Sequence, residues 1–249
     1  MKTDVVYNED CLFGLKRIPD KSVDLIVTDP PYKVATTGEG GTINNISKLN
    51  KSLKDLTNAG ITQGYDIKRF NIEFVRVMKS INIYIWCNKV QIPEYFNFYV
   101  NELDCKFDIL CWHKTNALPT YANKYLSDTE YCLYFRKGKG KCFPQSYDDA
   151  RTFSFTPINA KDKKQFGHPT IKPLDFTEKL IRNSSNEGKI VLDPFMGSGT
   201  TAVAAINTNR HYIGYELNTE YFNLIQNRIA NVSNIPHKTV VKYKRKSLI

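Results

Sequence analysis

One short stretch constrains this chain more than any other: an apolar run that ends in an acid, two prolines and a tyrosine, Leu25-Ile26-Val27-Thr28-Asp29-Pro30-Pro31-Tyr32. An apolar run of this length, rich in β-branched residues and bounded by turn residues, predicts a buried strand of a parallel sheet. Proline lacks the amide donor and restricts the residue before it, so the chain has to leave the sheet at Asp29. We therefore expect Asp29 and Tyr32 at the carboxyl end of a strand, where open α/β sheets bind their ligands.

A second motif lies late in the chain, where residues 189–201 predict a strand, a glycine turn and the start of a helix. Gly197 and Gly199 let the backbone turn sharply and let a ligand approach it without a clash with Cβ. The next predicted strand, 211–215, ends at Glu216, where nucleotide-binding βαβ units place a carboxylate for ribose hydroxyls; a helix N-cap is the structural alternative. The glycine pattern of nicotinamide-binding folds is incomplete, and the P-loop sequence Gly-Lys-Ser/Thr is absent.

Together the two motifs resemble the beta class of amino-group DNA methyltransferases, which methylate adenine N6 or cytosine N4. Asp29-Pro30-Pro31-Tyr32 is similar to the catalytic motif of that family, and residues 193–200 with Glu216 are similar to its S-adenosylmethionine site. The order of the motifs, catalytic first and donor last, is that of the beta class. The resemblance covers nearly the whole chain and implies a Rossmann-like α/β fold, with a mostly parallel seven-stranded sheet and helices on both faces.

The resemblance also implies roles for the catalytic residues Asp29, Pro30, Pro31 and Tyr32. The target base has to leave the duplex before its amino group is accessible, so Tyr32 is expected to stack on a flipped base. The Asp29 carboxylate and the Pro30 carbonyl would accept hydrogen bonds from the two amino protons, and neither a metal nor a covalent enzyme intermediate is required. Asp29 favours adenine N6 as the target. Cytosine N4, adenine in RNA and a catalytically silent nucleic-acid-binding subunit remain the alternatives.

The donor site implied by the resemblance draws on four parts of the chain. Asp10 would contact the adenine ring of the donor, although a helix N-cap explains it equally well. The segment 167–173 would pack on the donor from the other side, and Asp175 either joins it or only stabilises the first turn of a helix. The expected donor-binding residues are Asp10, Cys11, His168, Thr170, Lys172, Asp193, Pro194, Phe195, Gly197, Ser198, Gly199, Thr200, Glu216 and Leu217.

Three further segments are candidates for contact with the target. Residues 33–65 lack periodicity and are expected to form a mobile loop that closes over the base, with a surface insertion as the alternative. Residues 136–166 are basic and are interleaved with aromatic residues, which predicts a small target-recognition insertion, although ordinary loop chemistry also explains them. Trp112, Lys114 and Asn116 match a loop that lines the target pocket in the family, while Trp112 is equally compatible with the core.

Composition is consistent with one catalytic domain over residues 1–249 that binds double-stranded DNA. The chain has 41% hydrophobic residues and a net charge of +10, which suits a polyanionic partner, although a basic surface without a partner is the alternative. The six cysteines show no Cys-x-x-Cys spacing and no adjacent histidine cluster, so we expect buried thiols rather than a zinc site. We further expect a cytoplasmic location and a homodimer, and either a cognate restriction endonuclease as a second partner or an enzyme that acts without one.

The remaining periodicity predicts alternating helices and strands. Helices are expected over 11–18, 67–78, 91–103, 174–183, 202–206 and 219–229, and further strands over 4–8, 81–86, 107–112 and 130–135.

Overall fold

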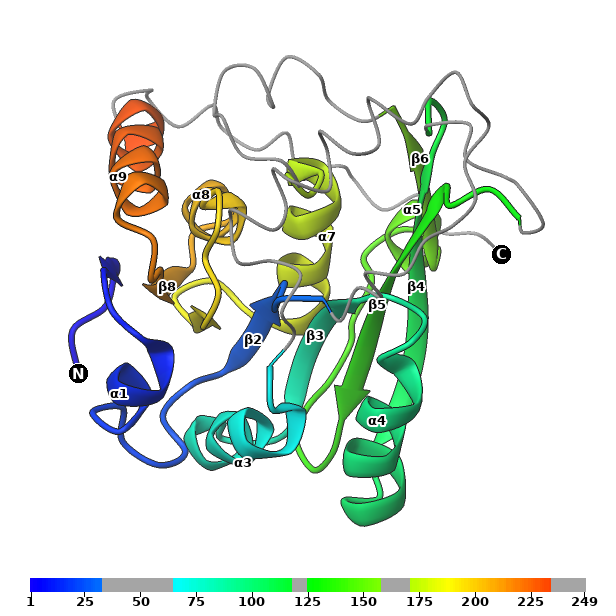
Figure 1. The fold of residues 1–249 in the computed structure, drawn as a ribbon, viewed down its shortest axis with the longest axis horizontal. Coiled ribbons are helices and arrows are strands. Elements are labelled where there is room, and N and C mark those ends of the chain that lie inside the picture. The colour runs from blue at the N-terminus through cyan, green and yellow to red at the C-terminus, as the bar shows by residue number, and fades with distance from the viewer. Residues whose placement is uncertain (33–64, 118–124, 158–170, 234–249) are drawn as a thin grey trace, which may run out of the picture.

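The computed structural model describes residues 1–32, 65–117, 125–157 and 171–233, and within them it shows one mixed sheet (Figure 1). Eight strands form this sheet in the order β1-β8-β7-β2-β3-β5-β4-β6. Their bounds are β1 Val5–Tyr7, β2 Leu25–Thr28, β3 Asn82–Cys87, β4 Lys106–Lys114, β5 Thr129–Arg136, β6 Phe153–Thr156, β7 Ile190–Asp193 and β8 His211–Tyr215.

The strand directions bring the two sequence motifs together at the carboxyl ends of neighbouring strands. β1, β8, β7, β2 and β3 are all parallel neighbours, whereas β5 runs antiparallel to both β3 and β4. All four residues of β2 are buried, and β2 lies directly between β7 and β3. The residues that follow β2 and β7 therefore leave the sheet side by side, in the crevice where α/β folds bind ligands.

Helices cover both faces of the sheet, as Figure 1 shows. On one face, Leu15, Phe74 and Tyr99 belong to a hydrophobic cluster with Ile26 and Ile83 of the sheet. On the other face, Phe176, Leu180 and Ile225 pack with Leu25 and Val27. The principal helices are α1 Cys11–Leu15, α3 Ile67–Val77, α4 Ile92–Phe96, the π-helical η2 Asn97–Glu102, α5 Tyr147–Ala150, α7 Leu174–Ser184, α8 Thr200–Asn207 and α9 Thr219–Ser233.

The α/β architecture with helices on both faces is confirmed, and three details differ from the sequence expectation. The sheet has eight strands rather than seven, because Phe153–Thr156 adds a parallel edge strand to β4. β4 continues to Lys114, so His113 and Lys114 lie in a strand rather than in a loop. The helix expected over 91–103 changes from α-helical to π-helical at Asn97. In the part of the chain that the structure describes, no helix has both the length and the apolar composition needed to cross a bilayer.

Candidate active site

A cavity of about 500 Å³ opens at the carboxyl ends of β1, β2, β7 and β8. This volume lies within the range of small-molecule and cofactor sites. Four loops supply most of its wall, namely residues 9–11, 28–32, 193–198 and 215–218. The catalytic and donor motifs therefore face one common space, as the order of the parallel strands requires.

Asp29 lies in this cavity, immediately after β2, with its two carboxylate oxygens in different environments. Oδ2 accepts a hydrogen bond from Lys172 Nζ at 2.5 Å. Oδ1 is enclosed and has no well-oriented hydrogen-bond partner; the Tyr32 hydroxyl also lacks a well-oriented partner but lies close enough to Asp29 to lower the pKa of that carboxyl. Burial raises the pKa of Asp29, and the neighbouring charge of Lys172 works against this increase. An enclosed carboxylate oxygen without a partner is costly, so a ligand that brings an N–H donor to Oδ1 gains a well-defined contact.

Lys172 lies between Asp29 and a second carboxylate that the sequence did not mark, Glu130 of β5. Its Nζ atom is 3.1 Å from Glu130 Oε2, and the other oxygen of Glu130 is 2.5 Å from Lys114 Nζ. The same Nζ lies over the rings of Tyr32 and Trp86, at 5.4 and 5.3 Å from their centroids. Lys172 was expected to contact the methyl donor; it lines the cavity, but its Nζ atom contacts the two carboxylates and the two rings.

The glycine turn forms as the sequence predicts, with left-handed backbone at Gly197 (φ 54°) and Gly199 (φ 79°). A Cβ on Gly199 would lie 3.1 Å from Cγ2 of Ile225, so α9 packs closely against the turn. Arg228 of α9 is buried and donates from Nη1 to the Ser198 carbonyl at 2.8 Å and to the Thr200 hydroxyl at 3.2 Å. The turn is thus held by α9 as well as by its own backbone, while Gly197 and Ser198 face the cavity.

Glu216 and Asp10 both line the cavity and both already bond to backbone amides. Glu216 accepts from Gly197 N and from Asn218 N, each at 2.8 Å, and burial raises its pKa. Asp10 accepts from Leu12 N at 2.7 Å, so the N-cap interpretation of Asp10 is confirmed. Each carboxylate retains lone pairs that these bonds do not use, so the bonds do not exclude a contact with a ligand.

Asp193 ends β7 and is buried beneath the turn. Its Oδ1 accepts from the Thr28 hydroxyl at 2.8 Å and from Phe195 N at 3.1 Å, which ties the donor loop to the last residue of β2. Burial raises the pKa of Asp193 to about 7. Burial also raises the pKa of Cys11, whose thiol faces the same cavity.

The structure does not bring every expected residue to the cavity. Trp112 is a core residue with 3% exposure, and its indole N–H donates to the Thr156 hydroxyl at 2.6 Å. Asn116 is exposed and does not line the cavity, and Asp175 accepts from Phe176 N, in keeping with a role in the first turn of α7. Gly199 shapes the turn without lining the cavity. His168, Thr170 and the loop 33–64 lie outside the described residues.

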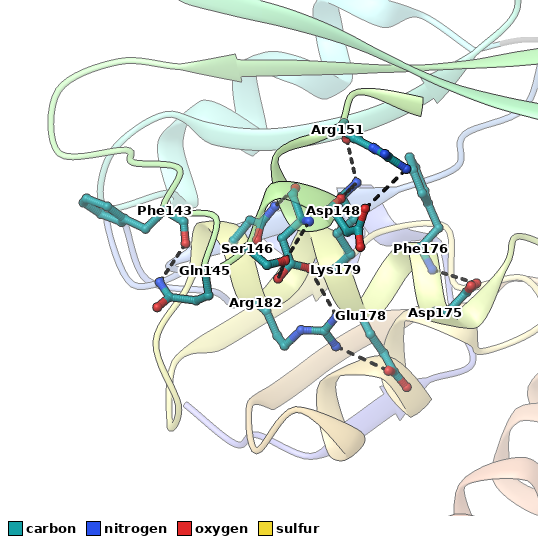
Figure 2. Close-up of polar contacts among 12 residues, drawn as sticks. Phe143, Gln145, Ser146, Asp148, Arg151, Asp175, Phe176, Glu178, Lys179 and Arg182 are labelled. Carbon is teal, nitrogen blue, oxygen red and sulfur yellow. Dashed lines mark hydrogen bonds and ion pairs between the residues drawn. The ribbon is translucent and has the colours of Figure 1, made fainter. Parts of the chain in front are cut away.

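The segment expected to recognise the target is described up to residue 157, and it is anchored to α7 (Figure 2). Lys179 of α7 donates to the carbonyls of Asp148 and Arg151, at 2.9 and 2.6 Å, which fixes the end of α5. The aromatic side chains of this segment remain outside the core, and Lys or Arg side chains lie over several of their rings. These exposed aromatic residues are Phe143, Tyr147, Phe153 and Phe155.

Sequence reasoning missed the aromatic wall of the cavity. Tyr65, Phe70 and Trp86 all line it, and the Phe70 ring stacks on Phe195 of the donor loop at 5.6 Å. Phe70 lies on α3, far from either motif in the sequence. Its helical spacing marks a packed face but gives no indication that this face meets the glycine turn.

Comparison with known proteins assigns the family. A family model described as DNA methylase, covering N6 and N4 methylases, matches residues 23–227. The chain belongs to this DNA methylase family. Its match includes both motifs and every strand from β2 to β8.

Individual relatives of this methylase are similar along most of their length. Type II methyltransferase M2.MboI of Moraxella bovis is 25% identical over 252 residues, covering 92% of this chain and 89% of that protein. Type II methyltransferase M.HpaI of Haemophilus parainfluenzae is 28% identical over 240 residues, covering 89% of this chain and 72% of that protein.

Solved structures agree with the fold. The crystal structure of the M1.HpyAVI–SAM complex matches with a TM-score of 0.66 at 26% identity, over 90% of this chain and 98% of that one. The cytosine-N4-specific PvuII DNA methyltransferase matches with a TM-score of 0.65 at 16% identity, over 94% of this chain and 92% of that one. The second likeness shows the fold alone. Together with the family match, these comparisons identify a DNA methyltransferase whose target, adenine N6 or cytosine N4, they do not distinguish.

Proposed function

We propose that this methylase transfers a methyl group from S-adenosylmethionine to the exocyclic N6 amino group of a flipped-out adenine in double-stranded DNA. The observation that carries the proposal is the unpartnered, enclosed Oδ1 of Asp29 in the same cavity as the glycine turn and Glu216. The acid at the first position of the motif is the form that its family associates with adenine. A cytosine-N4 or RNA-adenine target is the alternative that the test below separates.

The residues of the cavity suit the proposed methyl donor. Glu216 offers its remaining lone pairs to ribose hydroxyls, and the amide-rich turn at 197–199 gives the backbone close access to the ligand. Asp10, which follows β1, lines the same cavity and would contact the adenine ring of the donor. When bound, S-adenosylmethionine supplies an electrophilic methyl group on a positively charged sulfur.

The chain's own part in the reaction is to position and to accept protons. Asp29 Oδ1 and the Pro30 carbonyl accept hydrogen bonds from the amino group, which draws its nitrogen toward a tetrahedral geometry and frees the lone pair. Tyr32 stacks on the flipped base and holds it in plane. The C–N bond would form as the methyl–sulfur bond breaks and the demethylated donor leaves; one amino proton then has to leave, and Asp29 Oδ1 is the acceptor that the described residues offer. Catalysis of this kind depends chiefly on position.

The test is transfer of labelled methyl from S-adenosylmethionine to unmethylated DNA, followed by digestion to nucleosides, with Asp29→Ala as the control. We expect label in N6-methyladenine that disappears with the variant. Label in N4-methylcytosine would overturn the choice of base, and label only in an RNA arm of the assay would overturn the choice of polymer. Binding of the donor without transfer to either polymer would favour a catalytically silent subunit.

Two partner assignments accompany this proposal. The Type II names of the relatives support a cognate restriction endonuclease. Digestion of cellular DNA by that endonuclease, with and without prior methylation by this enzyme, would detect the site that methylation protects. A homodimer is the second assignment. Sedimentation of the purified chain measures it directly.

A further inference from the structure

A row of alternating charges crosses the base of the site, and the proposed reaction uses only its last member, Asp29. It runs Lys114, Glu130, Lys172, Asp29, with distances of 2.5, 3.1 and 2.5 Å between successive charged atoms. Its members come from β4, β5, the residue pair before α7 and the end of β2. Four distant segments of the chain therefore converge on one carboxylate.

The row is enclosed rather than a surface ion pair. The side chains of Lys172 and Glu130 are exposed by only 6% and 15%. Burying a charge is costly unless it is paired, so each member depends on its neighbours to remain ionised. With Lys172 in place the row sums to zero charge; without Lys172 it holds two carboxylates and one cation.

The geometry points to Lys172 as the positioning residue of Asp29: it binds Oδ2, keeps the carboxylate ionised and so leaves Oδ1 alone to receive the substrate amine, while Glu130 and Lys114 hold Lys172 in place. This inference rests on the proposed function for the identity of the amine. The ion pair itself does not depend on the substrate. Because Lys172 approaches one oxygen only, the carboxylate cannot rotate without breaking that bond.

The titration behaviour of the row supports the same assignment. Burial alone would lower the pKa of Lys172, but the charges of Asp29 and Glu130 raise it above its ordinary value. Burial would raise the pKa of Glu130, yet Lys172 and Lys114 lower it to about 2. For Asp29, burial and the charge of Glu130 raise the pKa, whereas Lys172 and the Tyr32 hydroxyl lower it. The other titratable groups facing Asp29 are Tyr32, Cys87, Cys132 and Asp193.

Removal of Lys172 and removal of Glu130 should therefore have opposite effects on the pKa of Asp29. Lys172→Met removes the cation, so the pKa of Asp29 should rise. Glu130→Gln removes an anion, so the pKa of Asp29 should fall or stay. If Lys172 and Glu130 only supported the fold, their removal would not shift the pKa of Asp29 in opposite directions.

The first measurement is made without DNA or donor. The protein is labelled with carbon-13 at the side-chain carboxyl of aspartate, and the Asp29 resonance is identified by its loss in Asp29→Asn. We expect its titration midpoint to rise by about one pH unit or more in Lys172→Met and not to rise in Glu130→Gln. Equal midpoints in the wild type and Lys172→Met would overturn the inference. Lys79→Met is the matched control, because Lys79 pairs with Asp24 at the opposite end of β2.

The second measurement is the pH profile of kcat and kcat/KM for methyl transfer, obtained by varying the donor and DNA concentrations at each pH. Lys172→Met should lower kcat at least tenfold and move the acid limb of kcat/KM upward, because ionised Asp29 then requires a higher pH. A donor-binding role for Lys172 predicts instead a raised KM for the donor with kcat unchanged, which would overturn the inference. If the wild type transfers no methyl to DNA while the Asp29 midpoint shifts as expected, the proposed function fails and the ion pair stands.

A double variant covers the case in which Lys172→Met folds poorly. Lys172→Met combined with Glu130→Gln removes one cation and one anion and restores zero charge to the row. We expect its thermal stability to recover relative to the single variant while kcat stays low and the Asp29 midpoint stays above that of the wild type. Recovery of kcat to the wild-type level would contradict a positioning role for Lys172.

Discussion

Arg228, buried in the last helix described, donates to the backbone carbonyl of Ser198 at 2.8 Å. This contact couples α9 to the turn that faces the proposed donor. Arg228→Met should therefore weaken donor affinity about tenfold and lower the free energy of unfolding by about 1–3 kcal/mol, because the Ser198 carbonyl and the Thr200 hydroxyl lose their donor. Calorimetric titration with S-adenosylmethionine and urea unfolding measure the two effects. Gln226→Met, on the exposed face of the same helix, is the control and should change neither.

Alanine variants of Gly199 and Gly188 distinguish the effect of backbone strain from that of steric contact. Both have positive φ, 79° and 72°, but a Cβ on Gly199 meets Ile225 at 3.1 Å whereas a Cβ on Gly188 meets nothing within 4 Å. Each change to alanine should cost about 1 kcal/mol of stability for the left-handed backbone. Gly199→Ala should cost more and should also lower donor affinity, whereas Gly188→Ala should leave that affinity unchanged. Equal effects on donor binding would contradict the close packing of the turn on α9.

Asp193 predicts a stability that depends on pH. Burial raises the pKa of Asp193 to about 7, whereas an aspartate in an unfolded chain titrates near 4, about its ordinary value. Between these values the folded protein holds a proton that the unfolded chain has released, so the free energy of unfolding falls as pH rises from about 4 to 7. This contribution is fully present below the unfolded pKa and is lost as pH passes the folded one.

Asp193→Asn removes that titration and should flatten the profile by on the order of 2 kcal/mol. Urea unfolding at pH 5 and pH 8, for the wild type and the variant, measures the difference. Asp148→Asn, at an exposed carboxylate of α5, should leave the slope as it is in the wild type. Parallel profiles for the wild type and Asp193→Asn would show that Asp193 is ionised in the folded protein across this range.

The two parts of Tyr32 should contribute unequally. The hydroxyl of Tyr32 has no well-oriented hydrogen-bond partner, although it lies near Asp29 and lowers the pKa of Asp29, while its ring lines the cavity. Tyr32→Phe should therefore keep kcat/KM for DNA within about threefold, and Tyr32→Ala should lower it about 10- to 100-fold through lost stacking on the flipped base. Steady-state methylation of one duplex by the three proteins measures both ratios. Equal losses in the two variants would transfer the role from the ring to the hydroxyl.

Phe155 tests the proposed contact with the target. It is 63% exposed at the edge of the sheet and stacks on His113 at 4.9 Å between ring centroids. Phe155→Ala should weaken DNA binding about tenfold and leave donor affinity unchanged. Phe13→Ala is the control, since Phe13 is 67% exposed on α1 in another part of the fold. Fluorescence anisotropy with a labelled duplex gives the affinities, and equal effects would remove the segment 136–166 from the interface.

The sequence predicted those parts of the site in which local chemistry dictates the backbone. Two prolines after an apolar run end β2 just before Asp29, and paired glycines shape the turn at 197–199. Asp29 and the glycine turn therefore reach one cavity, as expected. Glu130, Phe70 and Arg228 were not predicted, because each acts through a partner far away in the sequence. The position of each within its own helix or strand gives no sign of that partner.

The edge of the sheet shows the same limit. Phe153–Thr156 has the alternation of a strand, but its neighbours in sequence are those of a basic loop. Only the pairing of Cys111 with Phe153, and of the next three residue pairs, turns it into a strand. Trp112 was ambiguous for a related reason. A tryptophan at the end of a strand fits a pocket or a core, and the hydrogen bond to Thr156 decides for the core.

The pairing of β1 with β8 has a consequence for how the protein is made. Val5 lies beside Ile213, so β1 has no neighbour among the described strands until β8 has been made. Pairing between strands so far apart in the sequence is slow, because the chain loses the entropy of loop closure before the new contacts stabilise it. The wall of the cavity that holds Asp10 and Glu216 therefore cannot close until β8 has been made and has paired with β1.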